Sequence, residues 1–204
     1  MNEQSMVQMA PNRYFDRYFQ QEAVKILPGE FYATQSKRMI VTVLGSCVAV
    51  CLRDRRTGFG GMNHFLLPGD ISSGGDFLAE SARYGNYAME MLINQLIKFG
   101  ASRTQLEAKV FGGANLMQNM TVTNVGQRNA EFTLDYLRME NIPLLAQDLL
   151  DVYPRKIYFF PESGKVLVKK LRVLHNTTIM DRESEYRMRM RLSPKSGDVD
   201  LFEE

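Results

Sequence analysis

The sequence is poor in cysteine and histidine, with only two of each: Cys47, Cys51, His64 and His175. A secreted protein stabilised by disulfides would contain more cysteines at framework spacings, so we expect a cytoplasmic chain with reduced thiols. The scarcity is useful, because any thiol or imidazole chemistry must use these four side chains.

The sequence also lacks long apolar runs and a strong net charge. No run of about 18 apolar residues occurs and the N-terminus has no apolar segment typical of a signal peptide, so we expect neither a membrane span nor secretion. The formal net charge is +2, which argues against a dedicated nucleic-acid binder with a clustered basic face. A length of 204 residues favours one domain.

The order of apolar patterns predicts an α/β or α+β domain in which helices pack on β-sheet. An apolar, β-branched run predicts a strand over 39–44, and a similar run predicts one over 48–52. Further strands are predicted over 59–67 and 106–111, a short apolar one over 144–147, and a strand–turn–strand unit over 155–174. Helical periodicity predicts helices over 79–99 and 127–140. We divide the chain into an N-terminal extension (1–24) that packs loosely, one domain (25–180) and a charged C-terminal tail (181–204). The tail is interpreted as a docking element or a final edge strand, and 194–197 would break any helix there.

Cys47 is the first candidate for chemistry. It follows Gly45 and Ser46 at an abrupt break between two apolar runs, and glycine permits a backbone turn there that other residues resist. Such a turn projects a side chain from a rigid sheet and leaves backbone N–H groups free to form an oxyanion hole. A thiol is mostly protonated near neutrality unless a neighbouring imidazole takes its proton.

His64 is the obvious base for that thiol. A turn centred near Arg55 and Arg56 would join two strands, and residues equally far from the turn then become cross-strand neighbours. This pairing predicts that Cys47 and His64 meet. The alternatives are an inert buried cysteine and a structural histidine.

Cys51 and His175 are interpreted without a chemical role. In a strand, Cys51 would lie about 13 Å from Cys47, at about 3.3 Å per residue. That separation is too long for a disulfide and argues against a zinc site that uses both cysteines and His64. His175 follows a predicted strand beside polar residues, which is typical of the surface.

Two glycine-containing segments are further candidates. One segment comes directly after a predicted strand and consists of Gly112, Gly113, Ala114 and Asn115. It is interpreted either as a loop that approaches the substrate or as a plain turn. The segment 126–129 opens the second predicted helix, where free N–H groups bind an anion or simply form a helix cap.

Several segments of the chain resemble the chemoreceptor glutamine deamidases of the CheD family. They are TVLGSCVAVCLRD (Thr42 to Asp54), GGMNHFLLP (Gly60 to Pro68), FGGANLM (Phe111 to Met117), NVGQRNAEF (Asn124 to Phe132) and KILPGEFYAT (Lys25 to Thr34). The resemblance spans roughly residues 25–174. Each segment alone is a weak signal, whereas the combination of Gly-Ser-Cys, a downstream His-Phe-Leu-Leu-Pro and Phe-Gly-Gly-Ala-Asn is specific.

The resemblance implies a single three-layer α/β sandwich, similar to the catalytic domain of bacterial deamidating toxins. It implies a Cys–His pair at Cys47 and His64, with an upstream threonine, here Thr42, as the third member of a triad. The reaction would convert receptor glutamines to glutamate through a cysteine thioester, without a metal or an organic cofactor. The partners implied are the cytoplasmic helices of methyl-accepting chemoreceptors and a phosphatase similar to CheC.

Two other classes of function stay open at this point. A non-catalytic chemotaxis adaptor would keep the fold and bind receptors or a CheC-like phosphatase, although the presence of both Cys47 and His64 counts against it. A related thioester chemistry, either transamidation or ester hydrolysis, would use the same nucleophile.

Overall fold

The computed structural model describes residues 8–68, 75–115, 125–172 and 177–192. This part of the chain forms two mixed β-sheets with helices, which confirms the predicted mixed α/β class. The six-stranded sheet has the order β1 (Gln8–Met9), β4 (Glu30–Thr34), β7 (Gly60–Asn63), β6 (Val48–Asp54), β8 (Leu106–Gly112) and β9 (Leu144–Leu149). The five-stranded sheet has the order β11 (Lys165–Lys170), β10 (Arg155–Phe160), β5 (Met39–Leu44), β3 (Gln21–Lys25) and β2 (Asn12–Asp16).

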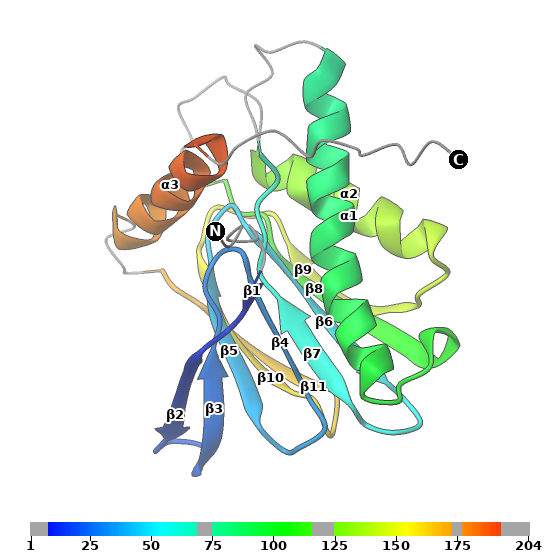
Figure 1. Cartoon of the computed structure of the whole chain (residues 1–204). Helices are drawn as coiled ribbons and strands as arrows, with labels where there is room; N and C mark the ends of the chain where they lie inside the picture. The colour runs from blue at the N-terminus through cyan, green and yellow to red at the C-terminus, as the bar shows by residue number, and fades with distance from the viewer. Residues whose placement is uncertain (1–7, 69–74, 116–124, 173–176, 193–204) are drawn as a thin grey trace, which may run out of the picture.

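Helices α1 (Gly75–Lys98) and α2 (Val125–Met139), the six-stranded sheet and the five-stranded sheet lie on one another in that order, and α3 (Thr177–Leu192) stands apart from the other two helices (Figure 1). Helices α1 and α2 pack on the six-stranded sheet. Two neighbouring residues of β7 face the two other layers. A Cβ added to Gly61 would meet Leu92 of α1, whereas one added to Gly60 would meet Phe159 of β10. The six-stranded sheet is therefore covered on both faces at its centre.

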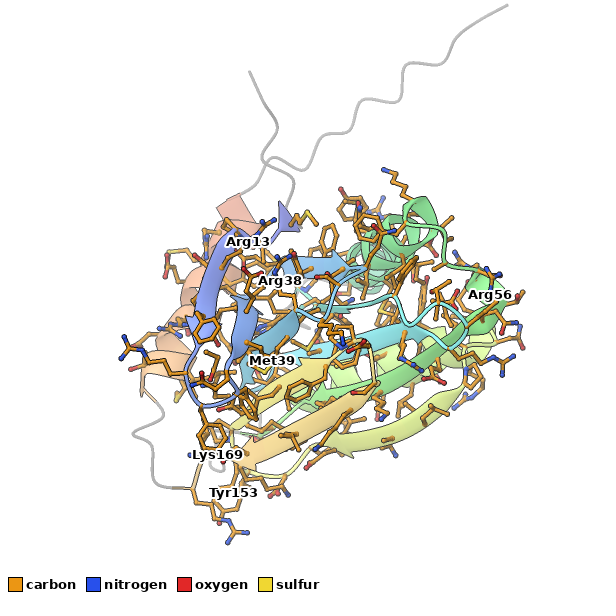
Figure 2. The ribbon with its side chains drawn as sticks, turned by 90° about the horizontal axis from the view of Figure 1, so that it is seen from below. Arg13, Arg38, Met39, Arg56, Tyr153 and Lys169 are labelled. Carbon is orange, nitrogen blue, oxygen red and sulfur yellow. The ribbon has the colours of Figure 1, made fainter. Side chains whose placement is uncertain are left out.

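The pattern of apolar and polar residues in each strand reflects how many of its faces are buried. Strand β6 is central, and its first five residues, Val-Ala-Val-Cys-Leu, are all buried as a continuous apolar run. Strand β10 alternates between buried and half-buried residues, as expected where only one face meets the main core. On the outer face of the five-stranded sheet, Met39 and its neighbours Ala23 and Val41 form a small second cluster beneath Phe19 and other aromatic side chains (Figure 2).

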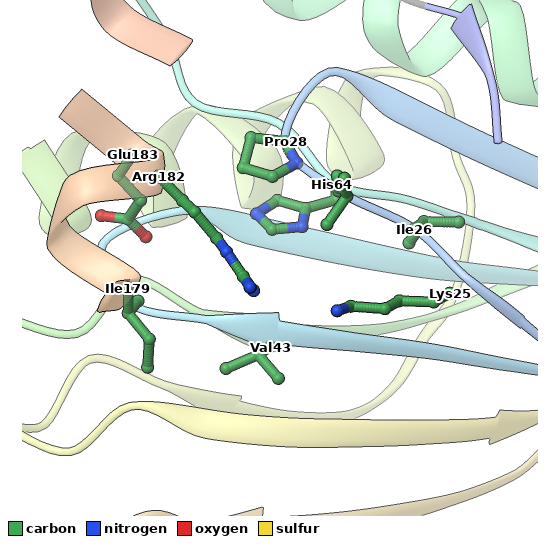
Figure 3. Close-up of a pocket in the computed structure, with 9 residues that line it drawn as sticks. Lys25, Ile26, Pro28, Val43, His64, Ile179, Arg182 and Glu183 are labelled. Atoms are coloured by element: carbon green, nitrogen blue, oxygen red, sulfur yellow. The ribbon is translucent and has the colours of Figure 1, made fainter. Parts of the chain in front are cut away.

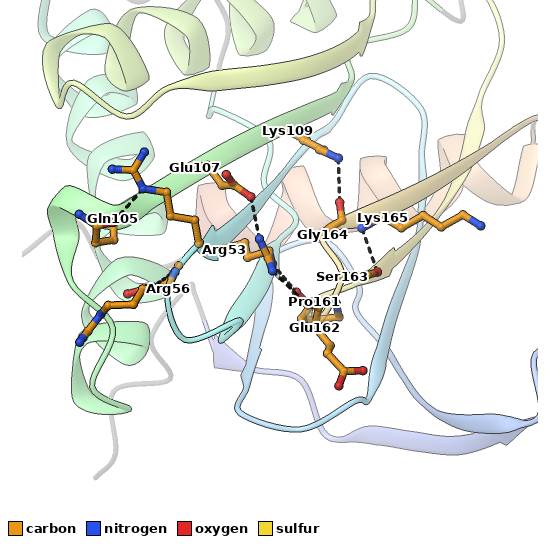
Figure 4. A network of polar contacts seen from close by, with 12 residues as sticks. Arg53, Arg56, Gln105, Glu107, Lys109, Pro161, Glu162, Ser163, Gly164 and Lys165 are labelled. Atoms are coloured by element: carbon orange, nitrogen blue, oxygen red, sulfur yellow. Dashed lines mark hydrogen bonds and ion pairs between the residues drawn. The ribbon is translucent and has the colours of Figure 1, made fainter.

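A polar network holds one end of the two sheets together (Figure 4). Arg53 of β6 donates to the carbonyls of Pro161 and Glu162 in the β10–β11 turn, at 3.0 and 2.9 Å, and pairs with Glu107 of β8 at 3.1 Å. Lys109 of β8 donates to the carbonyl of the same turn at Gly164, 2.7 Å away. The opposite end of the sandwich, where β5 passes into β6, carries the candidate site.

The segments at the two ends take part in the fold. Within the N-terminal stretch expected to pack loosely, β2 and β3 form an antiparallel pair, and β3 continues the sheet by pairing in parallel with β5. Ala23 and Val24 are fully buried, so this part of the stretch belongs to the core. At the other end, helix α3 (Thr177–Leu192) crosses the expected start of the tail at 181. His175 and residues 193–204, including the predicted helix break at 194–197, lie outside the described residues. The division into domain and ends stays a proposal.

None of the helices in the described ranges is both long enough and apolar enough to cross a membrane.

Candidate active site

Cys47 lies in the connection between β5 and β6, and its side chain is fully buried. The hairpin of β6 and β7 brings the segment of His64 beside it, because Val48 pairs with Phe65 through two backbone hydrogen bonds of 3.0 and 2.9 Å. This register differs from the expected one. The turn closes with the Asp54 N–H donating to the Phe59 carbonyl, so the hairpin is centred one residue later than Arg55 and Arg56.

The backbone of His64 is held from the neighbouring strand. Its N–H donates to the carbonyl of Glu30 at 2.9 Å, and its carbonyl accepts from the N–H of Gly29 at 2.8 Å. These contacts fix the imidazole between the two sheets, where only 2% of the residue is exposed.

Thr42 and His64 lie in direct contact, and the geometry fixes the proton on the imidazole. The Thr42 hydroxyl lies 2.8 Å from Nδ1 of His64 and donates to the Ile26 carbonyl at 2.9 Å. A hydroxyl has one proton, so Thr42 must accept from His64, and Nδ1 carries the ring proton. Nε2 then holds a lone pair and has no hydrogen-bond partner among the described residues. A neutral imidazole with a free Nε2 is the form that a general base requires.

Burial keeps both candidate catalytic groups neutral in this arrangement. Desolvation lowers the pKa of His64 from 6.5 to about 3. Desolvation, and next the negative charge of Glu183, raise the pKa of the Cys47 thiol well above its ordinary value. Burial therefore favours a thiol and a neutral imidazole over an ion pair between them.

The connection before β6 presents three backbone N–H groups to one point, and that point is occupied by the carboxylate of Glu183 from α3. Oε1 accepts from the N–H groups of Gly45 and Cys47 at 3.0 and 3.1 Å. Oε2 accepts from the N–H of Ser46 at 3.2 Å and from its hydroxyl at 2.5 Å. Donors at these distances match an oxyanion hole. The loop can thus stabilise a negative oxygen beside the thiol, as expected from the Gly-Ser-Cys sequence.

The segment after β8 supports this loop from behind. The N–H of Gly113 donates to the Cys47 carbonyl and that of Ala114 to the Gly45 carbonyl, each at 2.8 Å. Gly112 has a φ of 116°, and a Cβ there would lie 2.2 Å from the Cys47 carbonyl oxygen. Glycine is therefore required for the close approach. Asn115 is exposed, and its N–H donates to the Asp151 carbonyl at 2.8 Å.

Asn129 connects the segments of Cys47 and His64 by hydrogen bonds, a contact that the sequence analysis did not predict. It lies in the first turns of α2, fully buried, in the segment interpreted as an anion site or a cap. Its Nδ2 donates to the Ser46 carbonyl at 2.8 Å, and its Oδ1 accepts from the N–H of Leu67 at 3.0 Å. One side chain thereby links the loop of Cys47 to the strand segment that follows His64.

A small cavity lies between His64 and α3 (Figure 3). Its volume is about 20 Å³, which is room for about one water molecule. Figure 3 shows the imidazole of His64 between Pro28 and the side chains of Arg182 and Glu183. A water molecule there would have both a base and a carboxylate as partners.

Cys51 lies in the core, fully covered within β6. Among the residues that the structure describes, no cluster of three histidine, cysteine, aspartate or glutamate side chains is placed to hold a metal ion.

The structure brings His64 and Thr42 into direct contact and places the Cys47 thiol against Glu183. The segments of Cys47 and His64 are neighbours through the Val48–Phe65 bridge, whereas Nε2 of His64 makes no hydrogen bond to the thiol. One feature of the sequence could have indicated Glu183. Apolar residues lie four before, three after and seven after it, a spacing that places Glu183 on the apolar face of a helix.

Comparison with known proteins places the chain among chemotaxis proteins. Residues 66–170 match the family model described as CheD chemotactic sensory transduction. The chain is 63% identical to a probable chemoreceptor glutamine deamidase CheD 1 of Shewanella oneidensis, covering 95% of this chain and 94% of that protein. It is 56% identical to a probable chemoreceptor glutamine deamidase CheD of Thiobacillus denitrificans, covering 99% and 100%. A solved structure, the hypothetical protein YfiH of Bacillus licheniformis, shows a likeness with TM-score 0.41 and 13% identity, covering 72% and 64%.

Proposed function

The chain belongs to the CheD family, and we propose that it deamidates glutamine side chains of chemoreceptors with Cys47 as the nucleophile and His64 as the base. Relatives that are probable chemoreceptor glutamine deamidases share 56–63% of their residues with it over nearly the whole chain. The chain is accordingly a glutamine deamidase, an amidohydrolase. The geometry of the site supports the roles that we propose for the individual residues.

In the first half of the reaction, Nε2 of His64 takes the proton of the Cys47 thiol. The sulfur forms a bond to the carboxamide carbon of the glutamine, and the carbonyl oxygen becomes an oxyanion. The N–H groups of Gly45 and Cys47 donate to that oxygen. The imidazolium then gives its proton to the leaving amine, the C–N bond breaks, and ammonia departs from a thioester.

In the second half, water hydrolyses the thioester. His64 takes a proton from a water molecule, whose oxygen bonds to the thioester carbon. The C–S bond breaks, the thiolate regains a proton, and the product is a glutamate. Thr42 acts as a positioning residue throughout, because its hydroxyl keeps the ring proton on Nδ1. These steps use only water and groups of this chain.

The observation that carries the proposal is the convergence of backbone N–H groups on a carboxylate directly beside Cys47. An inert buried cysteine needs no such donors. A carboxylate and the tetrahedral intermediate of amide hydrolysis both place negative oxygens where those donors point.

The substrate and partners follow from the family. We infer that the enzyme acts in the cytoplasm on the cytoplasmic helices of methyl-accepting chemoreceptors, where each new carboxylate is a site for reversible methylation. A CheC-like phosphatase is a further partner by the same inference. The three-layer sandwich similar to deamidating toxins is part of this proposal.

The test is conversion of receptor glutamines, followed by mass spectrometry of the receptor's cytoplasmic helices. The wild type and Cys47→Ala are compared, with Cys51→Ala as the matched control because Cys51 is also buried and lies away from the N–H donors. We expect conversion by the wild type and Cys51→Ala, and none by Cys47→Ala. Binding of the receptor without conversion by any of the three would instead establish an adaptor.

Two neighbouring chemistries are separated in the same experiment. Addition of a primary amine would yield a substituted amide if the thioester transfers to amines. A receptor carrying methyl esters would lose them if the thiolate opens esters. We expect glutamate to remain the main product of glutamine in both arms.

A further inference from the structure

Helix α3 docks on the candidate site through one narrow stripe of side chains. The buried positions of its described side chains are Ile179, Glu183, Tyr186 and Met190, spaced by four, three and four residues. The intervening residues are mostly exposed, for example Glu185 and Met188. The hydroxyls of Tyr186 and Tyr84 of α1 hydrogen-bond, which anchors α3 to the helical layer as well.

Glu183 is the charged member of this otherwise apolar stripe. Burial of a carboxylate is costly unless hydrogen bonds replace its water. Here the three N–H groups and the hydroxyl of the Cys47 loop replace it, and only 3% of Glu183 remains exposed. A glutamate produced by the enzyme would leave its carboxylate at the same place, because the thioester carbon is bonded to Cys47.

We propose that α3 occupies the substrate site as a mimic of the product helix, with Glu183 in the place of the newly formed glutamate. The inference rests on the proposed deamidation by Cys47. According to this inference, the substrate is an α-helix with apolar side chains four residues before, three after and seven after the target glutamine. The surface beneath α3, from the Cys47 loop to Tyr84, is then the receptor-binding surface.

This arrangement keeps the enzyme at rest until a receptor helix displaces α3. The Glu183 carboxylate fills the oxyanion hole and hydrogen-bonds to the thiol, so neither is available to another substrate. Its negative charge also opposes formation of the thiolate. The charges that face Cys47 in the structure are Glu183 and Arg187, both on α3, and they act in opposite directions.

Glu183→Gln turns the mimic into a substrate and provides the test. If α3 presents position 183 as a receptor helix presents its glutamine, the enzyme will convert the introduced carboxamide back to a carboxylate in its own chain. Intact-mass and peptide spectrometry detect the exchange of NH2 for OH at that position. We expect conversion in Glu183→Gln and none when Cys47→Ala is added. Glu185→Gln is the matched control, because Glu185 is exposed on the same helix and its replacement should stay glutamine.

The outcomes separate this inference from the proposed function on which it rests. If Glu183→Gln keeps its introduced glutamine and still converts receptor glutamines, the proposal that α3 mimics the product helix is wrong, and the proposed deamidase function stands. If Glu183→Gln keeps its glutamine and the wild type does not convert receptor glutamines, both the mimicry by α3 and the proposed deamidation are contradicted. Conversion at position 183 in the Cys47→Ala background would also contradict the inference, since the reaction would not use the thiol.

A second variant tests the docking of α3 through its apolar stripe, with Glu183 and Cys47 left in place. Ile179→Asp places a charge in the buried stripe and is expected to release α3, raising the rates of receptor conversion and of Cys47 alkylation about tenfold. Met188→Asp is the control, because Met188 is 62% exposed on the same helix, and its rates should equal those of the wild type. Unchanged rates in folded Ile179→Asp would contradict the displacement of α3.

Discussion

Replacing Thr42 with valine is expected to slow the reaction through the imidazole and not through substrate binding. Valine has nearly the shape of threonine but cannot accept the proton of His64 Nδ1, which lies 2.8 Å from the hydroxyl. A buried donor left without an acceptor costs about 1–3 kcal/mol. The tautomer with a free Nε2 is destabilised by this amount. Since about 1.4 kcal/mol corresponds to a factor of ten, the ratio of this tautomer to the other should fall about 5–150-fold, and kcat should fall with it.

The assay is steady-state conversion of receptor glutamines, with stability measured in parallel by urea unfolding. KM should stay near the wild-type value, because Thr42 is fully buried beneath His64 and away from the helix-binding surface. Thr42→Ser keeps the hydroxyl and should restore most of kcat. A folded Thr42→Val enzyme whose kcat lies within about twofold of the wild type would refute the assignment of Thr42 as a positioning residue.

The remaining predictions concern stability. Gly112→Ala would place a Cβ 2.2 Å from the Cys47 carbonyl oxygen at a φ of 116°, whereas Gly100 has a φ of 97° and no atom within 4 Å of its added Cβ. Urea unfolding should show a loss of about 2–6 kcal/mol for Gly112→Ala and only about 1–2 kcal/mol for Gly100→Ala, and equal losses would contradict the close approach. For His64, the folded pKa of about 3 lies below the ordinary 6.5, so the unfolded chain alone binds the proton between these values. The free energy of unfolding should therefore fall as pH falls below 6.5, by at most about 1.4 kcal/mol per pH unit. In His64→Gln this pH dependence should be weaker by the contribution of one proton.

Most elements of the fold are local enough to be predicted from the sequence. Strands β5 and β6 contain long apolar runs, β8 begins with alternating apolar and charged residues, and α1 and α2 show helical periodicity. The residues of each segment therefore predict which of its faces is buried. Strands β2 and β3 are different. Much of their surface is polar and exposed, and β3 is defined by pairing with β5. That non-local pairing left no comparable pattern in the residues themselves.

The candidate site also has a part that local sequence predicts and a part that depends on tertiary contacts. The segments of Cys47 and His64 lie at the open end of one hairpin, so their placement depends on a single turn. That turn is centred one residue later than expected, which shifts the cross-strand pairing by two residues. Glu183 meets the Cys47 loop from 136 residues away. Its helix is rich in exposed charge, which concealed the apolar stripe. Only the tertiary structure shows that a carboxylate fills the hole prepared for a substrate oxygen.

Attack of Cys47 on the glutamine carboxamide can be tested with an electrophilic substrate analogue. A receptor-helix peptide whose target glutamine is replaced by a chloroketone analogue should alkylate the nucleophile, and peptide mapping identifies the modified residue. We expect labelling of Cys47, slowed by the unmodified receptor helix, with Cys51 left unmodified. Labelling of Cys51 alone, or of neither cysteine by an enzyme that converts the glutamine peptide, would contradict it.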